Sequence, residues 1–130
     1  FLGPKLEGKD VILIDDMISS GKSILEIASL LKKRGAGKIF ICTTFGLFTE
    51  GMEKFDEAYQ NGIFDKLLTT NLVYQTPELL SKPYYITCDM SKYIALIIDT
   101  LNHDMSVSHL LNPVDRIKRC VNKYMAQYEK

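Results

Sequence analysis

Apolar residues follow two different spacings along this chain, and segments with the two spacings alternate. Short, mainly apolar runs are typical of strands buried in a parallel sheet. Such runs occur at residues 11–14, 39–44, 65–70 and 84–88. Apolar side chains three or four positions apart predict helices. This spacing occurs at residues 24–34, 50–61, 90–101 and 113–128. Because strand, helix and strand in succession favour right-handed βαβ units, the pattern predicts an α/β fold built on a parallel sheet.

Three features predict how individual elements begin or pack. Thr49 is expected to cap the second helix, which would run from residue 50 to about residue 61. Pro113 stands at a favoured first-turn position of the last helix. The helix at 90–101 is apolar on nearly all sides, so we expect protein to cover it on more than one side.

The junction between the first strand and the first helix carries the candidate chemistry. Two adjacent carboxylates, Asp15 and Asp16, directly follow the apolar run, and residues 19–23 form a short loop before the helix. Open α/β sheets bind ligands at the carboxyl ends of their strands. A helix N-terminus offers unpaired N–H groups and the positive end of the helix dipole to a phosphate. Carboxylates beside an anion site indicate a ligand with a phosphate at one end and hydroxyls or a bound cation at the other, as in a sugar phosphate.

Two other interpretations of this stretch compete with a sugar-phosphate site. Gly21-Lys22-Ser23 could be the end of a nucleotide-binding P-loop, but that motif needs a glycine five residues before Gly21. Asp16 stands at that position, where its carboxylate would repel a polyphosphate, so we reject the P-loop. Alternatively, the stretch is an ordinary strand, turn and helix in which the two carboxylates serve as a cap and a turn residue.

Composition bounds the class of protein and its partners. A chain of 130 residues corresponds to one domain or a piece of one. Its 16 Lys and Arg balance 16 Asp and Glu, so net charge gives no reason to expect nucleic acid or an acidic membrane as a partner. No apolar run approaches the roughly 20 residues that cross a bilayer, and no signal peptide is visible.

The cysteines and histidines predict neither disulfides nor a metal site. Cys42, Cys88 and Cys120 form no CxxC pair, and the first two lie in apolar strand patterns. This favours buried, reduced thiols and a cytoplasmic protein. His103 and His109 lack carboxylate or cysteine partners at metal-ligand spacing, so we expect surface or capping roles for them.

The stretch from Ile12 to Ser23 resembles the ribose-phosphate binding motif of the type I phosphoribosyltransferase fold. That motif consists of an apolar strand, two acids and a Thr/Ser/Gly loop. The resemblance implies that Asp15 and Asp16 bind the 2′- and 3′-hydroxyls of a ribose. It implies that the 5′-phosphate is bound by Ser19, Ser20, Gly21, Lys22 and Ser23. The implied fold is a parallel sheet with helices on both faces, here a partial domain followed by a C-terminal helix.

Further segments resemble the ribose-phosphate pyrophosphokinase family, also called PRPP synthetases. In chain order they are Thr44-Phe45-Gly46-Leu47-Phe48, Thr69-Thr70-Asn71 with Gln75, Asp89-Met90-Ser91 and Ser106-Val107-Ser108-His109-Leu110-Leu111. The match covers about residues 8–112. We therefore expect an arm at 1–9, a partial phosphoribosyltransferase-like domain at 10–112 and a helical extension at 113–130. Phe45 replaces a histidine of the family, and Ser19 replaces an acid.

The second resemblance implies a defined reaction. In this family the anomeric hydroxyl of ribose 5-phosphate attacks the β-phosphorus of Mg-ATP, so that pyrophosphate is transferred and AMP is released. The chain would supply the ribose 5-phosphate half, with Mg²⁺ as cofactor and ATP as co-substrate. It would act in a homo-oligomer, with residues 90–101 and 114–128 as candidate contacts.

The same resemblance places the other half of the site outside these residues. The catalytic, ATP and pyrophosphate loops of the family lie upstream of the segment that matches Val11. Because the sequence starts at Phe1 and not at methionine, we expect a longer protein. On this interpretation, the present residues alone bind ribose 5-phosphate weakly and catalyse nothing.

Two alternative functions share parts of this pattern. A phosphoribosyltransferase that consumes PRPP has the same ribose-phosphate motif, and Ile18-Ser19-Ser20-Gly21 fits it slightly better, whereas the Thr-Asn loop and the apolar tail fit it worse. A PRPP-sensing or synthetase-associated protein without turnover is favoured by Phe45 and Ser19.

Overall fold

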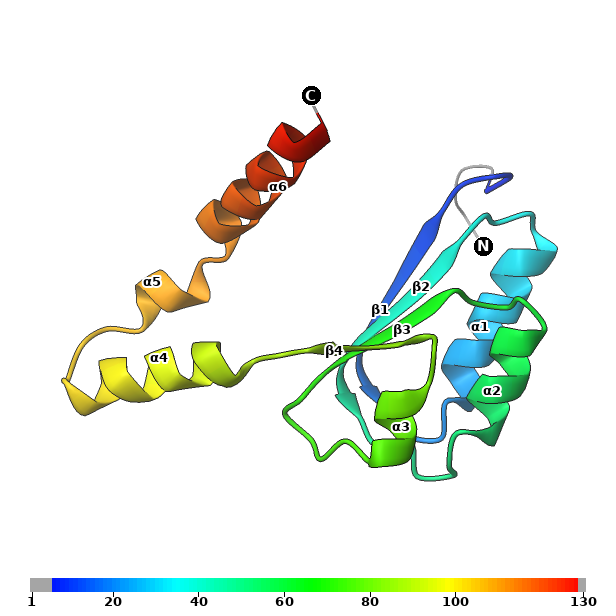
Figure 1. Cartoon of the computed structure of the whole chain (residues 1–130), viewed down its shortest axis with the longest axis horizontal. Coiled ribbons are helices and arrows are strands. Elements are labelled where there is room, and N and C mark those ends of the chain that lie inside the picture. The colour runs from blue at the N-terminus through cyan, green and yellow to red at the C-terminus, as the bar shows by residue number, and fades with distance from the viewer. Residues whose placement is uncertain (1–5, 129–130) are drawn as a thin grey trace. The chain divides into compact units, whose positions relative to one another are not determined.

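The computed structural model describes residues 6–128, except for the side chains at 109 and 128. The chain divides after Met90 into two compact units, Phe1–Met90 and Ser91–Lys130. Figure 1 labels the elements. The first unit contains β1 (Val11–Ile18), α1 (Lys22–Lys33), β2 (Ile39–Gly46), α2 (Glu53–Gln60), β3 (Lys66–Thr70), α3 (Pro77–Ser81) and β4 (Tyr85–Cys88). The second contains α4 (Ser91–Asn102), α5 (Ser108–Leu111) and α6 (Val114–Tyr128). Parts of the expected arm and extension, at 1–5 and 129–130, lie outside the described residues.

The expected α/β fold with a parallel sheet is confirmed. Four strands pair in parallel in the order β1-β2-β3-β4, so each connection joins neighbouring strands. The pairing aligns four polar residues near the carboxyl ends of the strands. They are Asp15, Thr43, Thr69 and Thr87, each opposite the next, and we call them the cross-strand row. Because residues opposite one another in register point to the same face, the row lies on one side of the sheet.

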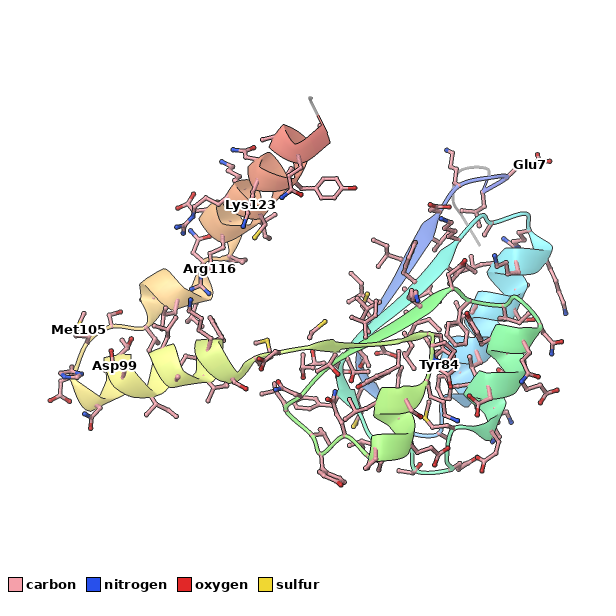
Figure 2. All side chains as sticks on the ribbon, in the orientation of Figure 1. Glu7, Tyr84, Asp99, Met105, Arg116 and Lys123 are labelled. Carbon is pink, nitrogen blue, oxygen red and sulfur yellow. The ribbon has the colours of Figure 1, made fainter. Side chains whose placement is uncertain are left out.

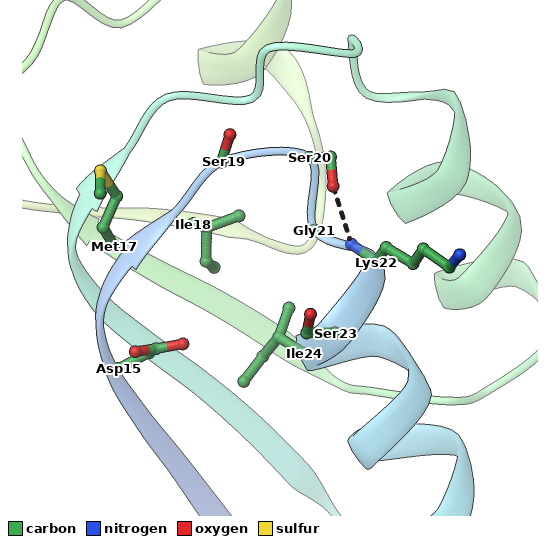
Figure 3. A pocket seen from close by; sticks show the side chains of 9 residues that line it. All are labelled: Asp15, Met17, Ile18, Ser19, Ser20, Gly21, Lys22, Ser23 and Ile24. Atoms are coloured by element: carbon green, nitrogen blue, oxygen red, sulfur yellow. Dashed lines mark hydrogen bonds between the residues drawn. The ribbon is translucent and has the colours of Figure 1, made fainter.

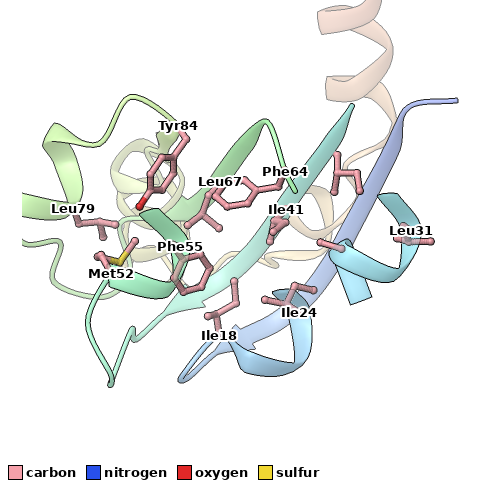
Figure 4. Packing of buried hydrophobic residues seen from close by; sticks show 12 residues of the cluster. Ile18, Ile24, Leu31, Ile41, Met52, Phe55, Phe64, Leu67, Leu79 and Tyr84 are labelled. Carbon is pink, nitrogen blue, oxygen red and sulfur yellow. The ribbon is translucent and has the colours of Figure 1, made fainter. Parts of the chain in front are cut away.

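The hydrophobic core lies between the sheet and the helices α1, α2 and α3, all on one side of it (Figure 1). Figure 4 shows three aromatic side chains of this core, Phe55, Phe64 and Tyr84, beside Leu67 and Ile41. Phe64 packs edge-on against both other rings, with centroids 6.4 Å from Phe55 and 5.3 Å from Tyr84. Such edge-to-face pairs add to the stabilisation from burial alone. The core therefore fixes α2 against the sheet close to the carboxyl ends of the strands.

The opposite face of the sheet is only partly covered in this unit, and it is most exposed on β1. On β1, Ile12 is 63% exposed and Ile14 is 81% exposed. The prediction that the first strand is fully buried is thus wrong for the described residues, because β1 is an edge strand and the helices of residues 6–90 lie on the other face.

Several element ends differ from the sequence prediction. β1 does not stop at the two acids but continues through them to Ile18, paired with β2. Thr49 does not cap α2, which begins only at Glu53 and has Met52 as its N-cap. The backbone N–H of Thr49 instead donates to the Ser19 carbonyl at 3.1 Å. The short helices α3 and α5 were not predicted. For α3 the sequence does hold a signal, since the Thr76 hydroxyl accepts from the Leu79 N–H at 3.1 Å and Pro77 occupies the first turn.

A polar cluster joins α2, α3 and β4 at the edge of the core. Tyr84 donates to one carboxylate oxygen of Asp56 at 2.7 Å, and Lys82 lies 2.6 Å from the other. Lys82 also pairs with Glu78 at 3.2 Å. In Figure 2, Tyr84 points into the packed side chains of this unit. The cluster gives α2 a second, polar attachment beside its aromatic one.

In the second unit, side chains of α4 and α6 both bond to a backbone carbonyl of α5. The Leu110 carbonyl accepts from the Tyr93 hydroxyl at 2.9 Å and from the Arg116 guanidinium at 3.0 Å, whose central carbon lies 5.0 Å from the Tyr93 ring centroid. α4 nevertheless leaves large apolar side chains exposed, including Ile98 and Leu101, so the cover expected on more than one side is not provided within this unit. Four of the described α6 side chains are basic: Arg116, Lys118, Arg119 and Lys123. Arg116 is half-buried, and the other described side chains of α6 are exposed.

One expectation about the histidines and one about membrane-spanning segments can be compared with the structure. The His103 Nδ1 lies 2.8 Å from the Asp99 carbonyl and 3.4 Å from its carboxylate, so the expected surface or capping role is confirmed for His103. The side chain of His109 lies outside the described part of the chain. Among residues 6–128, no helix is long and apolar enough to cross a membrane.

Candidate functional site

A pocket of about 180 Å³ opens where β1 passes into α1 (Figure 3). It is lined by Asp15, Met17, Ile18, Ser19, Ser20, Gly21, Lys22, Ser23 and Ile24. Six of the seven residues predicted for the site are therefore brought together. The seventh, Asp16, is exposed beside the pocket and does not line it.

The loop that forms the pocket depends on a glycine. Gly21 has φ = 80°, in the left-handed region that side chains rarely adopt. A Cβ at this position would lie 2.3 Å from Cζ of Phe55, whose ring is fully buried beneath the loop. Both the backbone conformation and the ring of α2 therefore require glycine here.

The loop is also fixed from the side by the segment after β2. The Leu47 N–H donates to the Ile18 carbonyl at 2.9 Å. The hydroxyls of Ser19 and Thr49 lie 3.3 Å apart, and this contact strengthens the backbone bond between the two residues. The loop thus has a defined shape supported by two neighbouring segments.

The N-terminus of α1 is open to the pocket. Its N-cap, Gly21, offers no side-chain acceptor, and the first turn contains no acidic residue. The Lys22 backbone N–H makes a long hydrogen bond, 3.4 Å, to the Ser20 hydroxyl (Figure 3). A helix end of this kind has N–H donors and a positive dipole for an anion.

The two carboxylates at the end of β1 are both exposed. Oδ1 of Asp15 accepts from the Asp16 backbone N–H at 2.9 Å. Within the described part of the chain, neither aspartate takes part in a salt bridge. Figure 3 shows the Lys22 side chain extended away from Asp15 and toward α2, so only its backbone is turned to the pocket. Exposed carboxylates next to N–H donors can bind hydroxyls and an anion of one ligand.

Five residues that line or support this site were not predicted from the sequence. Met17, Ile18 and Ile24 line the pocket, and Phe55 and Thr49 support the loop. Met17, Ile18 and Ile24 lie next to predicted residues in the sequence, so their place in the chain could have identified them as pocket residues. The supporting contacts of Phe55 and Thr49 come from residues about 30 positions away, and no local pattern marks them.

The cysteines near the sheet are free, and Cys42 and Cys88 are half-buried. Burial, and then the neighbouring Cys88, raise the pKa of the Cys42 thiol. A raised pKa keeps the thiol protonated at neutral pH, which does not suit a nucleophile or a metal ligand. Among residues 6–128 there is also no group of three or more His, Cys, Asp or Glu side chains placed to hold a metal ion.

The sheet, the pocket and the open helix N-terminus define an α/β protein with an accessible pocket at the loop between its first strand and first helix. The chain belongs to the phosphoribosyl synthetase-associated domain family, whose sequence profile matches residues 3–112. The family resemblance seen in the sequence is thereby confirmed. α6 lies beyond the matched residues.

Relatives with known names agree with this assignment. A ribose-phosphate pyrophosphokinase of Shewanella oneidensis is 29% identical over 107 residues, which are 82% of this chain and 33% of that protein. The chloroplastic ribose-phosphate pyrophosphokinase 2 of rice is 31% identical over 105 residues, 81% of this chain and 25% of that protein. The crystal structure of phosphoribosylpyrophosphate synthetase from Mycobacterium smegmatis superposes with a TM-score of 0.68 at 22% identity, covering 78% of this chain and 33% of that one, and shows the shared fold. The chain spans a third or less of the length of these relatives.

Proposed function

We propose that this chain provides the ribose 5-phosphate site of a ribose-phosphate diphosphokinase. The enzyme would transfer pyrophosphate from Mg-ATP to the 1-hydroxyl of ribose 5-phosphate and so make PRPP for nucleotide biosynthesis in the cytoplasm. One observation carries the proposal: the open N-terminus of α1, the serine loop and Asp15 surround a single pocket. The names of the relatives support the reaction class.

Each end of the sugar phosphate has matching groups. The 5′-phosphate would accept from the first-turn N–H groups of α1 and from the hydroxyls of Ser19, Ser20 and Ser23, where the helix dipole favours its charge. The 2′- and 3′-hydroxyls would donate to Asp15 and Asp16, which are acceptors when ionised. Asp16 would have to meet the ribose from outside the pocket, since it does not line it.

Magnesium would enter this site with ATP. Mg²⁺ in phosphoryl-transfer enzymes is held by one or two carboxylates together with substrate phosphates. The exposed carboxylates of Asp15 and Asp16 suit this chemistry, and Mg²⁺ would neutralise charge that develops on the transferred group. The residues that bind ATP would come from elsewhere in a larger, homo-oligomeric enzyme.

The site assignment is tested by ribose 5-phosphate binding to the full-length protein, measured by calorimetry. Asp15→Asn and Asp16→Asn should each weaken binding by more than about 1 kcal/mol, the scale of a lost charge-assisted hydrogen bond. Asp104→Asn, an exposed change in the second unit, is the matched control and should bind as the wild type does. Unchanged binding in either site variant would remove that carboxylate from the site.

The reaction is tested by AMP formation from ATP and ribose 5-phosphate in the same protein. Formation of AMP with PRPP as co-product supports the diphosphokinase. No AMP from ATP and ribose 5-phosphate, together with consumption of PRPP and a free base to give a nucleoside monophosphate and pyrophosphate, would indicate a phosphoribosyltransferase instead. Binding of ribose 5-phosphate without turnover in either assay would favour a non-catalytic member, in keeping with Phe45 and Ser19.

A further inference from the structure

The carboxyl ends of β3 and β4 are joined by the side-chain amide of Gln75, a residue with no part in the pocket. Its Nε2 donates to the Tyr85 hydroxyl at 2.6 Å and to the Thr70 carbonyl at 3.2 Å. Its Oε1 accepts from the Thr87 hydroxyl at 3.1 Å. The donor and acceptor sides of this half-buried amide are thus both used, and one side chain connects two strand ends to the loop after β3.

A second amide, that of Asn71, fixes the other end of the same loop. Its Nδ2 donates to Asp89 at 2.8 Å, and its Oδ1 accepts from the Met90 backbone N–H at 2.8 Å. Asn71 and Gln75, which we call the amide pair, therefore bracket three residues of the loop. Among these three, Tyr74 is 79% exposed. The loop is held by its ends and not by burial of its middle.

The amide pair connects with the cross-strand row that contains Asp15. Thr87 is the last member of the row and bonds to Gln75 directly. Thr69, the member before it, is 1% exposed, and its hydroxyl is bonded to the Tyr85 hydroxyl that Gln75 also holds. The Thr70 hydroxyl donates to the Thr44 carbonyl at 2.6 Å and so ties β3 to β2. Because β2 pairs with β1, the network reaches the strand that presents Asp15.

We propose that Gln75 is a positioning residue for the sugar-phosphate site. Together with Asn71, Gln75 keeps the carboxyl ends of the strands and the loop at 71–75 in one arrangement before the ligand binds. The ligand then does not have to order these segments when it binds. A site that is ordered in advance binds more tightly, because less conformational entropy is lost. This inference rests on the proposed function, since it takes ribose 5-phosphate as the ligand.

The test uses the full-length protein and two measurements, ribose 5-phosphate affinity by calorimetry well below the melting temperature and hydrogen exchange of the peptide at 70–76. Gln75→Leu removes every bond of the amide while keeping similar volume. We expect about tenfold weaker binding, from the ordering that the ligand must then supply, together with faster exchange at 70–76. Gln60→Leu makes the same change at the exposed end of α2 and should leave both measurements at wild-type values.

A second variant keeps the test informative if Gln75→Leu does not fold. Gln75→Glu retains the acceptor for Thr87 but loses the donor to the Thr70 carbonyl, so its affinity and loop exchange should fall between those of wild type and Gln75→Leu. A lower melting temperature with wild-type affinity in the folded protein would overturn the positioning role.

The outcome separates this inference from the proposed function. Wild-type binding that Asp16→Asn weakens and Gln75→Leu does not would refute the positioning role alone. No binding of ribose 5-phosphate to the wild-type protein would refute the proposed function, and this inference with it.

Discussion

At the scale of single residues, Gly21 sets the shape of the loop between β1 and α1. Gly21→Ala would place a methyl group in the left-handed region and 2.3 Å from the Phe55 ring. We expect it to lower the free energy of unfolding by about 1 kcal/mol for the backbone and by about 1–3 kcal/mol more for overpacking. Urea denaturation measures the loss.

Gly62→Ala is the matched control for this prediction. Gly62 also has positive φ, at 66°, but a Cβ there meets no atom within 4 Å. It should therefore show only the backbone part of the loss. Equal losses in the two variants would mean that the Phe55 ring moves aside at no cost.

The residues that line the pocket between β1 and α1 could largely be predicted from the sequence, because they are contiguous and their chemistry is local. Asp15 and residues 19–23 were predicted and share one pocket. The role of Phe55 could not be predicted, because it depends on how α2 packs under the loop. The direction of the Lys22 side chain could not be predicted either. It turns toward α2, while the backbone of Lys22 faces the pocket.

At the scale of elements, Tyr84 attaches β4 to α2 through Asp56. Tyr84→Phe keeps the buried ring and removes the donor. We expect a loss of about 1–2 kcal/mol in the free energy of unfolding, because the hydrogen bond is to a charged group. Tyr74→Phe, on an exposed side chain, should cost nothing measurable in the same denaturation experiment. A loss confined to Tyr74→Phe would contradict this account of the cluster.

The same cluster predicts a dependence of stability on pH. Burial raises the pKa of Asp56, but hydrogen bonds from Lys82 and Tyr84, and the charge of Lys82, outweigh it and lower the pKa. A carboxyl group with a lower pKa in the folded state stabilises the fold above its unfolded pKa of about 3.9. That stabilisation is lost as the pH falls through the folded value.

Asp56→Asn isolates this contribution. The variant should be less stable than wild type at pH 7 and should lose less of its remaining stability between about pH 5 and 3. Unfolding in urea at several pH values gives both slopes. Parallel slopes would show that other carboxylates account for the acid sensitivity.

The types and order of the main elements could be predicted from the sequence. The residues at which the elements end, and the faces that other elements bury, could not. Alternation of the two apolar spacings predicted all four strands and the four longer helices. β1 was predicted too short, because strand pairing with β2 overrides the low strand preference of Asp15 and Asp16. Its exposed face was not foreseen, since an apolar run does not reveal whether a strand stands at the edge of a sheet.

At the scale of the whole molecule, the first unit should fold without help from α6. Every buried residue of its core lies between Ile18 and Tyr84. Removal of residues 113–130 should leave hydrogen-exchange protection of β2 and β3 unchanged. Protection of α4 and α5 should fall, because the contacts of Arg116 with Leu110 and Tyr93 are lost.

Arg116→Ala in the full-length chain is the comparison for that deletion. It should reproduce the loss of protection in α4 and α5 while α6 is retained. Loss of protection in β2 or β3 in either protein would show that the first unit depends on the C-terminal residues.

The nearly neutral isoelectric point of the chain depends on the basic side chains of α6. Residues 1–112 contain 11 Lys and Arg against 14 Asp and Glu, while residues 113–130 contain five against two. The sequence pI of 6.9 is therefore an average over two segments of opposite sign. A proteolytic fragment that ends before α6 should migrate as an acidic protein in isoelectric focusing. Such a shift in isoelectric point would report cleavage before α6 while the sheet stays intact.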